Sequence, residues 1–167
     1  MSKSIILEGV DGTGKSSIAQ VLSSVFNKRV HRIGGAPKDD ADMCRHLDEQ
    51  LQMAKNGATV LDRTTAISQR VYGDVLGTGF HNDYLEQHIR RILSTGAILV
   101  LCETEEICHT TEPHDDARQV QRMLSNIDLI KQTYRDVLDT IGEDYIVYDF
   151  RKDPTGEELI NDIRDLL

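Results

Sequence analysis

The strongest constraint on the fold is a glycine-rich octapeptide, Gly9–Ser16, that joins a short apolar run to an amphipathic segment. It reads Gly-Val-Asp-Gly-Thr-Gly-Lys-Ser and matches the pattern G-x-x-x-x-G-K-[ST] in full. The preceding run, Ile5–Leu7, has the length and side chains of a buried strand, and the following segment has helical periodicity. A strand, such a loop and a helix in this order predict the P-loop of a nucleoside triphosphate-binding protein.

Each residue type in this loop has a chemical reason for its place. Glycines permit positive φ, so that successive backbone N–H groups converge on an anion, aided by the positive end of the following helix. We expect Lys15 to follow the β- and γ-phosphates of ATP and the Ser16 hydroxyl to ligate Mg²⁺. Ser17 is either a further phosphate ligand or an ordinary residue of the first helical turn. The predicted nucleotide-binding residues are Gly9, Asp11, Gly12, Thr13, Gly14, Lys15, Ser16 and Ser17.

The rest of the chain alternates strand-length and helix-length segments. Continuous apolar runs such as Ile98–Leu101 suit the central strands of a parallel sheet, which are buried on both faces. The predicted strands are Ser4–Leu7, Arg29–Ile33, Thr59–Leu61, Ile98–Cys102 and Tyr145–Tyr148. The predicted helices are Ser16–Phe26, Ala41–Lys55, Asp83–Leu93, Val120–Ile141 and Thr155–Leu167. We therefore expect an α/β fold, a single P-loop domain over residues 1–167 with about five parallel strands flanked by helices.

One stretch, Glu103–Ala117, shows neither the hydrophobic period of a helix nor that of a strand, and it follows a predicted buried strand. It contains Pro113 and several charged residues, which are typical of a connection between elements. We interpret it as a mobile lid over the site, spanning roughly residues 103–118, and the alternative is a surface loop without a functional role.

Charge and hydropathy narrow the class of protein. The formal net charge is -9, the opposite of what broad binding to a nucleic-acid backbone favours, although a few local cations still suffice for a small anionic substrate. No apolar run approaches the roughly 20 residues that cross a bilayer, and the N-terminus lacks the pattern of a signal peptide. We expect a cytoplasmic protein (in the host cytoplasm if it is viral) without a membrane partner.

The cysteine pattern does not predict a disulfide framework. Cys44, Cys102 and Cys108 are odd in number and show no C-x-x-C spacing. A metal site of Cys102 and Cys108 with His109 and His114 is conceivable. A buried strand-end cysteine beside loop residues is the interpretation that we favour, since no zinc-type spacing is present.

A second constellation, Asp62-Arg63, follows the apolar run Thr59–Leu61. It is therefore expected at the carboxyl edge of the sheet, where open α/β sheets bind ligands. Asp62 is suited to hold Mg²⁺ or to accept a proton from an acceptor group, and Arg63 offers a bidentate fork to a phosphate. The alternative is a strand-end salt bridge. The sequence has no base-reading N-K-x-D motif, which disfavours a GTPase switch.

These motifs resemble those of the thymidylate kinase-like nucleoside and nucleotide kinases. The segment Ile6–Ser17 is similar to the family's E-G-x-D-G-x-G-K-S-[ST] loop, and Leu61–Arg63 is similar to its D-R motif. The continuation Ile67–Gly73 resembles short, phage-type members with I-S and then V-Y-G. A strand ending near Asp149 followed by a closing helix after Pro154 extends the likeness over nearly the whole chain.

The resemblance implies an enzyme that transfers the ATP γ-phosphate to a (deoxy)nucleoside monophosphate, in deoxynucleotide metabolism. It implies that Asp11 binds the acceptor sugar, that Arg63 binds the acceptor phosphate, and that Asp62 lies close to the metal. Arg32 stands where the family has an R-E-P-G-G loop near the acceptor, and Tyr72 lies in the V-Y-G motif. Both are therefore candidate substrate contacts.

The sequence departs from the family at two points. It is shorter than most thymidylate kinases, around the base-recognition helices and the lid. Gly12 follows Asp11, so the arginine that some members carry in the loop is absent, and the nearest lid candidates are Arg118 and Arg122. Each is either a catalytic arginine that reaches the transferring phosphate or a solvated helix residue.

Several functional alternatives remain open at this level. The acceptor is a nucleoside monophosphate, or else a hydroxyl of a deoxynucleoside, a modified nucleotide or a DNA base. A third alternative is an ATP-binding regulator without transfer activity. A homodimer through Asp83–Leu93 is conceivable, although core packing explains the apolar pattern of this segment better.

Overall fold

The computed structural model describes residues 2–33, 35–77, 82–108, 117–142 and 144–167. Its five strands form one parallel sheet in the order β2-β3-β1-β4-β5, flanked by helices, so the predicted fold class is confirmed. The strands are β1 Ile5–Glu8, β2 Arg29–Arg32, β3 Thr59–Asp62, β4 Ile98–Cys102 and β5 Ile146–Tyr148. The helices are α1 Lys15–Phe26, α2 Asp40–Asn56, α3 Thr65–Leu76, α4 Asn82–Leu93, α5 Ala117–Ser125, α6 Ile127–Ile141 and α7 Glu157–Leu166.

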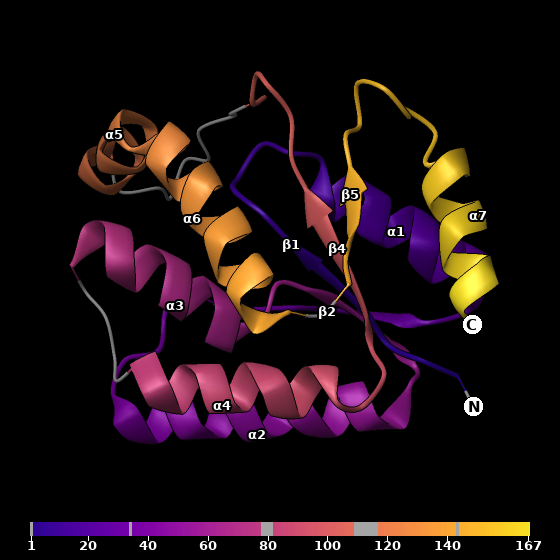
Figure 1. The fold of residues 1–167 in the computed structure, drawn as a ribbon, viewed down its shortest axis with the longest axis horizontal. Coiled ribbons are helices and arrows are strands. Elements are labelled where there is room, and N and C mark those ends of the chain that lie inside the picture. The colour runs from indigo at the N-terminus through magenta and orange to yellow at the C-terminus, as the bar shows by residue number, and fades with distance from the viewer. Residues whose placement is uncertain (1, 34, 78–81, 109–116, 143) are drawn as a thin grey trace.

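Helices cover both faces of this sheet, in three layers (Figure 1). Alternate side chains of β1 belong to different cores, because successive residues of a strand point to opposite faces. Ile5 and Leu7 pack with α1 and α7, whereas Ile6 packs with α2, α3, α4 and α6. Burial on both faces explains the uninterrupted apolar runs of β1 and β4.

The strand order places the end of β1 at the centre of the carboxyl edge. After β1 the chain crosses to β2 on one side of the sheet, whereas after β3 it crosses past β1 to β4 on the other side, so the adjacent ends of β1 and β3 form a topological switch point. The register aligns Leu7 with Asp62 and Glu8 with Leu101. The loop that follows Glu8 therefore lies beside the residues that follow β3.

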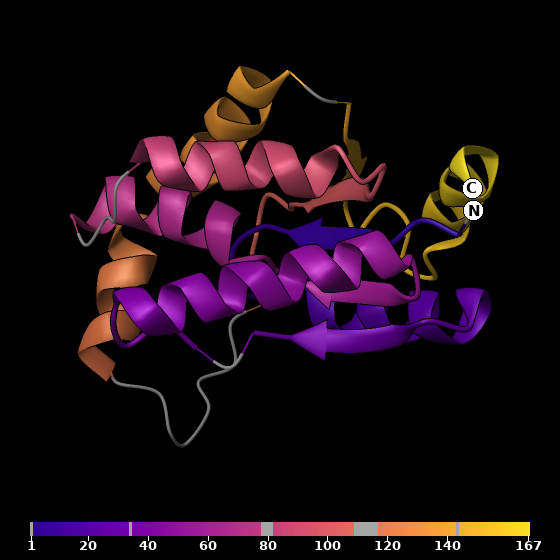
Figure 2. The same cartoon turned by 90° about the horizontal axis from the view of Figure 1, so that it is seen from below.

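One helix, α3, was absent from the sequence-based prediction. It packs on α4 and α6 (Figure 2). Its buried apolar side chains are Ala66, Ile67 and Val71. Thr64 caps its amino end by accepting a hydrogen bond from the N–H of Ile67, and Gly77 ends it in a left-handed conformation. Its inner face includes Thr65 and Gly73, and these residues weaken the apolar periodicity that identifies a helix in a sequence.

The prediction of a single long helix over Val120–Ile141 is wrong, because the helix is interrupted at Asn126, between α5 and α6. Asn126 has φ −117° and ψ 15°, outside helical geometry, and its side-chain amide donates to the carbonyl of Arg122. The break redirects the inward face, so that Leu124 is 40% exposed whereas Ile130 is buried. The local sequence keeps a helical period across the break, which is why periodicity alone missed it.

The apolar face of α4 belongs to the core. Leu85, Ile89 and Ile92 are each at most 2% exposed, so core packing rather than a dimer face accounts for their spacing. On α1, Val25 is 41% exposed, whereas Ile18 and Leu22 of the same helix are buried. None of the helices within the described residues is long and apolar enough to cross a membrane.

Candidate active site

The glycine-rich loop runs from the end of β1 into α1, as the motif predicts. Gly9, Gly12 and Gly14 have φ values of 133°, 79° and 79°, a region that side chains disfavour. Gly9 also has no room for a side chain, since a Cβ there would lie 2.1 Å from the carbonyl oxygen of Cys102. The loop conformation therefore depends on glycine for both dihedral and packing reasons.

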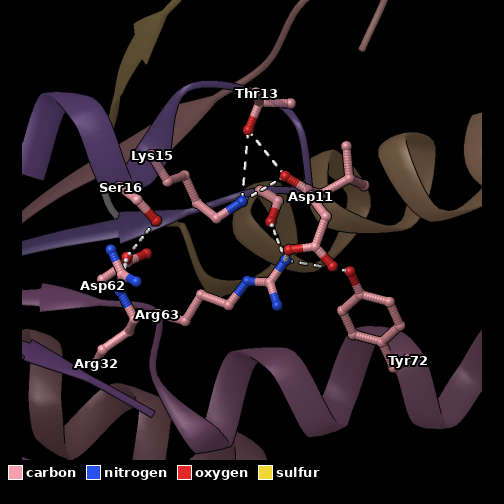
Figure 3. Close-up of polar contacts among 10 residues, drawn as sticks. Asp11, Thr13, Lys15, Ser16, Arg32, Asp62, Arg63 and Tyr72 are labelled. Carbon is pink, nitrogen blue, oxygen red and sulfur yellow. Dashed lines mark hydrogen bonds and ion pairs between the residues drawn. The ribbon is translucent and has the colours of Figure 1, made fainter. Parts of the chain in front are cut away.

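Lys15 begins α1, and its side chain folds back into the loop (Figure 3). Its Nζ donates to the carbonyl of Val10 and lies 3.5 Å from Oγ1 of Thr13, which itself donates to the same carbonyl at 2.8 Å. Burial, and secondarily the charge of Arg63, lower the pKa of Lys15 to about 8. The ammonium group is thus held in a poorly solvated place, and none of the carboxylates within the described residues is hydrogen-bonded to it.

Ser16 and Asp62 meet at the start of α1 and the end of β3. The Ser16 hydroxyl donates to Oδ2 of Asp62 at 2.9 Å, and Asp62 is only 4% exposed. A hydroxyl and a carboxylate oxygen at this separation are suitable ligands for a hard divalent cation such as Mg²⁺. Nε of Arg32 also lies 3.1 Å from the same oxygen, so the predicted substrate contact Arg32 pairs with Asp62 in this structure.

Arg63 directs its guanidinium toward the glycine-rich loop. It donates to Oδ1 of Asp11 at 2.7 Å and to the carbonyl of Gly9 at 3.2 Å. The hydroxyl of Tyr72 lies 3.4 Å away, and the guanidinium carbon is 5.7 Å from the centre of that ring. The structure therefore brings Asp11, Arg63 and Tyr72 together, although they lie on three separate elements (Figure 3).

Glu8 is a buried carboxyl near Arg63 that the sequence motifs did not indicate as a site residue. Glu8 is fully buried at the end of β1, and its Oε1 accepts hydrogen bonds from the N–H and the hydroxyl of Thr64, at 2.6 and 2.8 Å. Burial raises the pKa of Glu8 to about 7, although the hydrogen bonds of Thr64 and the charge of Arg63 oppose the shift. A charged residue that ends an apolar strand run was the available clue.

Tyr134 of α6 is a second residue near the site that the sequence motifs did not indicate. Its ring lies edge-on to that of Tyr72, with 6.3 Å between centroids, and it is 1% exposed. Tyr134 is therefore a core residue that also contacts Tyr72 of the site.

The predicted lid is described only at its two ends. At the first end, the N–H of Cys108 donates to the carbonyl of Gly12 at 2.9 Å, so this part of the chain lies against the glycine-rich loop. At the other end, Arg118 and Arg122 lie on α5, and Arg122 donates to the carbonyl of Leu76 at 2.7 Å. Residues 109–116 between these ends, and with them His109 and His114, lie outside the described residues.

Comparisons with known proteins support the fold. No family model matches the chain, and no curated protein matches it in sequence. The YorR protein of Bacillus subtilis, solved in complex with phosphorylated GDP, is 21% identical, with a TM-score of 0.64 over 98% of this chain and 94% of its own. The deoxyadenosine kinase of M. mycoides, solved with dCMP and dCDP, is 13% identical, with a TM-score of 0.55 over 97% and 99%.

A thymidylate kinase from Ehrlichia chaffeensis is similar to the same extent. It is 15% identical, with a TM-score of 0.56 over 97% of this chain and 98% of its own. At such identities the likeness concerns the fold, and the three matches each extend over almost the whole of both chains. The fold is that of P-loop nucleotide kinases.

Proposed function

We propose that this protein is a nucleotide kinase that transfers the γ-phosphate of ATP to the phosphate of a (deoxy)nucleoside monophosphate. The observation that carries the proposal is the position of Arg63, whose guanidinium lies against the glycine-rich loop at Gly9 and Asp11. A P-loop binds a donor triphosphate, and a largely buried arginine beside it suits a second phosphate, because its planar fork matches phosphate oxygens. The shared fold of nucleotide kinases agrees with this assignment.

On the donor side, the loop N–H groups and the amino end of α1 would hold the triphosphate. Phosphate oxygens would replace the Val10 carbonyl as partners of Lys15, which gives its buried ammonium an anionic partner. Ser16 and Asp62 would hold Mg²⁺, which supplies positive charge to the β- and γ-phosphate oxygens. Ser17 is exposed on the next position of α1 and remains a candidate phosphate ligand.

On the acceptor side, a phosphate would compete with Asp11 for the guanidinium of Arg63. Asp11 is half-exposed, so its carboxylate is free to turn toward a sugar hydroxyl of the acceptor once the ion pair opens. Tyr72 and Arg32 would line the same side of the site, and Arg118 or Arg122 would act from the proposed lid. Catalysis in such a site consists mainly of positioning and of charge neutralisation.

A hydroxyl acceptor is a second candidate. The similarity to a deoxyadenosine kinase favours it, and Asp62 would then accept the proton of the acceptor hydroxyl. The similar solved structures carry guanine, cytosine or adenine nucleotides, or bear the name of a thymidylate kinase, so they leave the base open. Gly12, which stands where some thymidylate kinases carry the loop arginine, argues against assigning thymidine monophosphate as the specific acceptor.

The test is ADP release from ATP and Mg²⁺ against a panel of deoxynucleoside monophosphates and the matching nucleosides. Turnover with a monophosphate supports the proposal. Turnover with nucleosides alone favours the second candidate function, a kinase that acts on a hydroxyl acceptor. ATP binding without turnover across the panel contradicts the proposal and favours either a modified nucleotide or DNA base as the acceptor or an ATP-binding regulator without transfer activity.

Two variants test the residues. Lys15→Ala and Arg63→Ala should each slow transfer to a monophosphate by about 100-fold or more, because each removes charge stabilisation at the reacting phosphates. The exposed Arg164→Ala on α7, remote from the loop, is the matched control and should retain full turnover. Near-full activity of both site variants would refute the assignment, and an effect of Arg63→Ala confined to monophosphates would identify the acceptor phosphate as its partner.

A further inference from the structure

We infer that Glu8 and Gln50 are positioning residues that hold the chain reversal at Arg63 and so aim its guanidinium at the glycine-rich loop. Neither residue contacts the loop phosphate site itself through a hydrogen bond that the structure describes. Each accepts a hydrogen bond from one of the two backbone N–H groups that immediately follow Arg63. The inference rests on the proposed function for its kinetic consequence, but its structural part stands apart from it.

The reversal begins while the chain is still in the sheet. The N–H of Arg63 donates to the carbonyl of Leu7 at 2.9 Å, which continues the β1–β3 ladder by one residue. Arg63 then takes φ 75°, a left-handed conformation that is unfavourable for a residue with a side chain. Such a conformation persists only where the surrounding structure imposes it.

Two buried side-chain oxygens impose it. The N–H of Thr64 donates to Oε1 of Glu8 at 2.6 Å, and the N–H of Thr65 donates to Oε1 of Gln50 at 2.8 Å. Glu8, Gln50, Thr64 and Thr65 are all at most 2% exposed, so water cannot replace either acceptor. Because a buried N–H without a partner is costly, these two bonds select the turned conformation over a continued strand.

Glu8 makes the larger contribution. Its Oε1 also accepts from the Thr64 hydroxyl at 2.8 Å, and that hydroxyl caps the first turn of α3. One carboxyl oxygen thereby joins the end of β1, the reversal after β3 and the start of α3. Tyr72, which packs on the Arg63 guanidinium, lies on this same helix.

Three variants separate positioning from simple stabilisation. Glu8→Met removes the acceptor while keeping a similar volume, and Glu8→Gln keeps an amide oxygen in the place of Oε1. Gln50→Met removes the second acceptor and serves as an independent variant if Glu8→Met does not fold. Arg63→Ala is combined with Glu8→Met in a double-mutant cycle.

With the monophosphate that the panel identifies, we expect Glu8→Met to lower kcat/KM for the acceptor by about 100-fold, as misplaced reacting groups do. The KM for ATP should change by no more than about threefold, since the donor loop is intact. Glu8→Gln should retain acceptor kinetics, and Gln50→Met should show a smaller loss of the same kind. In the Arg63→Ala background, Glu8→Met should cost little more, because both substitutions remove the same contact.

A second readout does not depend on transfer. Nε of Arg63 is buried and has no hydrogen-bond partner among the described residues, so its N–H should give a protected NMR signal, assigned by its loss in Arg63→Ala. We expect Glu8→Met to shift or broaden this signal and Glu8→Gln to preserve it. If wild type transfers no phosphate but the signal behaves in this way, the proposed function fails and the positioning role stands. Folded Glu8→Met and Gln50→Met variants with a wild-type Arg63 signal and unchanged acceptor kinetics would overturn the inference.

Discussion

The buried carboxyl of Glu8 predicts a specific dependence of stability on pH. Its pKa rises from 4.5 to about 7 in the folded protein, because burial disfavours the charged form. Between these two values the folded state holds the proton more firmly than the unfolded state does. The stability contribution of Glu8 is therefore fully retained below pH 4.5 and is lost as the pH rises through 7.

The magnitude follows from this shift. A difference of about 2.5 pKa units corresponds to about 3 kcal/mol of unfolding free energy, of which about 1 kcal/mol is lost between pH 6 and pH 8. Glu8→Gln cannot ionise but keeps an oxygen acceptor for Thr64. The stability of this variant relative to wild type should therefore rise by about 1 kcal/mol over that interval and level off above pH 8.

The measurement is urea denaturation of both proteins at several values between pH 6 and pH 8.5, well above the isoelectric point of about 5.1. Far-UV circular dichroism is the appropriate probe, since the chain has no tryptophan. Comparing two variants at each pH cancels the titration of all other groups. Glu158→Gln, an exposed carboxyl on α7, is the matched control for removing one carboxylate. A stability difference that stays constant across the interval would show that Glu8 does not change its protonation there, and would refute the reasoning.

Two further predictions concern the glycine-rich loop. Burial lowers the pKa of Lys15 from 10.5 to about 8, so the unfolded state binds more protons than the folded state between pH 8 and pH 10.5. The stability of the wild type relative to Lys15→Met should therefore rise with pH over that range. A stability difference that stays constant in denaturation experiments would contradict this prediction. Gly9→Ala should destabilise the protein by about 3 kcal/mol or more, because positive φ is combined with a Cβ only 2.1 Å from a carbonyl oxygen. The control Gly96→Ala also lies at a positive φ, 79°, but has open space around the Cβ, and should cost only about 1 kcal/mol. Equal losses of melting temperature in the two variants would show that the close contact at Gly9 relaxes freely.

The sequence was a good guide wherever one segment carried its own pattern. The apolar runs of β1, β3 and β4 predicted strands buried on both faces, and all three are in the parallel sheet. Segments with mixed faces were less well predicted. α3 buries Thr65 and Gly73 among its apolar residues, and the break at Asn126 lies within an unbroken helical period. Local periodicity reports how much of a segment is buried, not where its backbone bends.

The residues of the candidate site also fall into those that the sequence predicts and those that only the structure brings to light. The loop Gly9–Ser16 and the pair Asp62-Arg63 were identified from residue types alone, since phosphate binding requires glycines, a lysine and a hydroxyl at fixed spacing. Their roles in catalysis remain predictions that the kinetic experiments test. Tyr72 came from the family resemblance rather than from its own chemistry. Glu8 stands out in the sequence as a charged residue at the end of an apolar strand, but no neighbouring residue indicates that its hydrogen-bond partner is Thr64.

The sequence by itself thus determined the class of fold and the position of the glycine-rich loop after β1, and it predicted phosphate binding by this loop and a role for the acidic and basic pair at the end of β3. Only the tertiary structure decided that the register of β1 with β3 sets Leu7 beside Asp62, and that the chain reverses at Arg63 under two buried acceptors. The physical reason is the range of the interactions. Glycine dihedrals and apolar periods act over a few neighbouring residues. The hydrogen bonds that aim Arg63 join residues 15 and 56 positions apart, and they exist only once the sheet and α2 have packed.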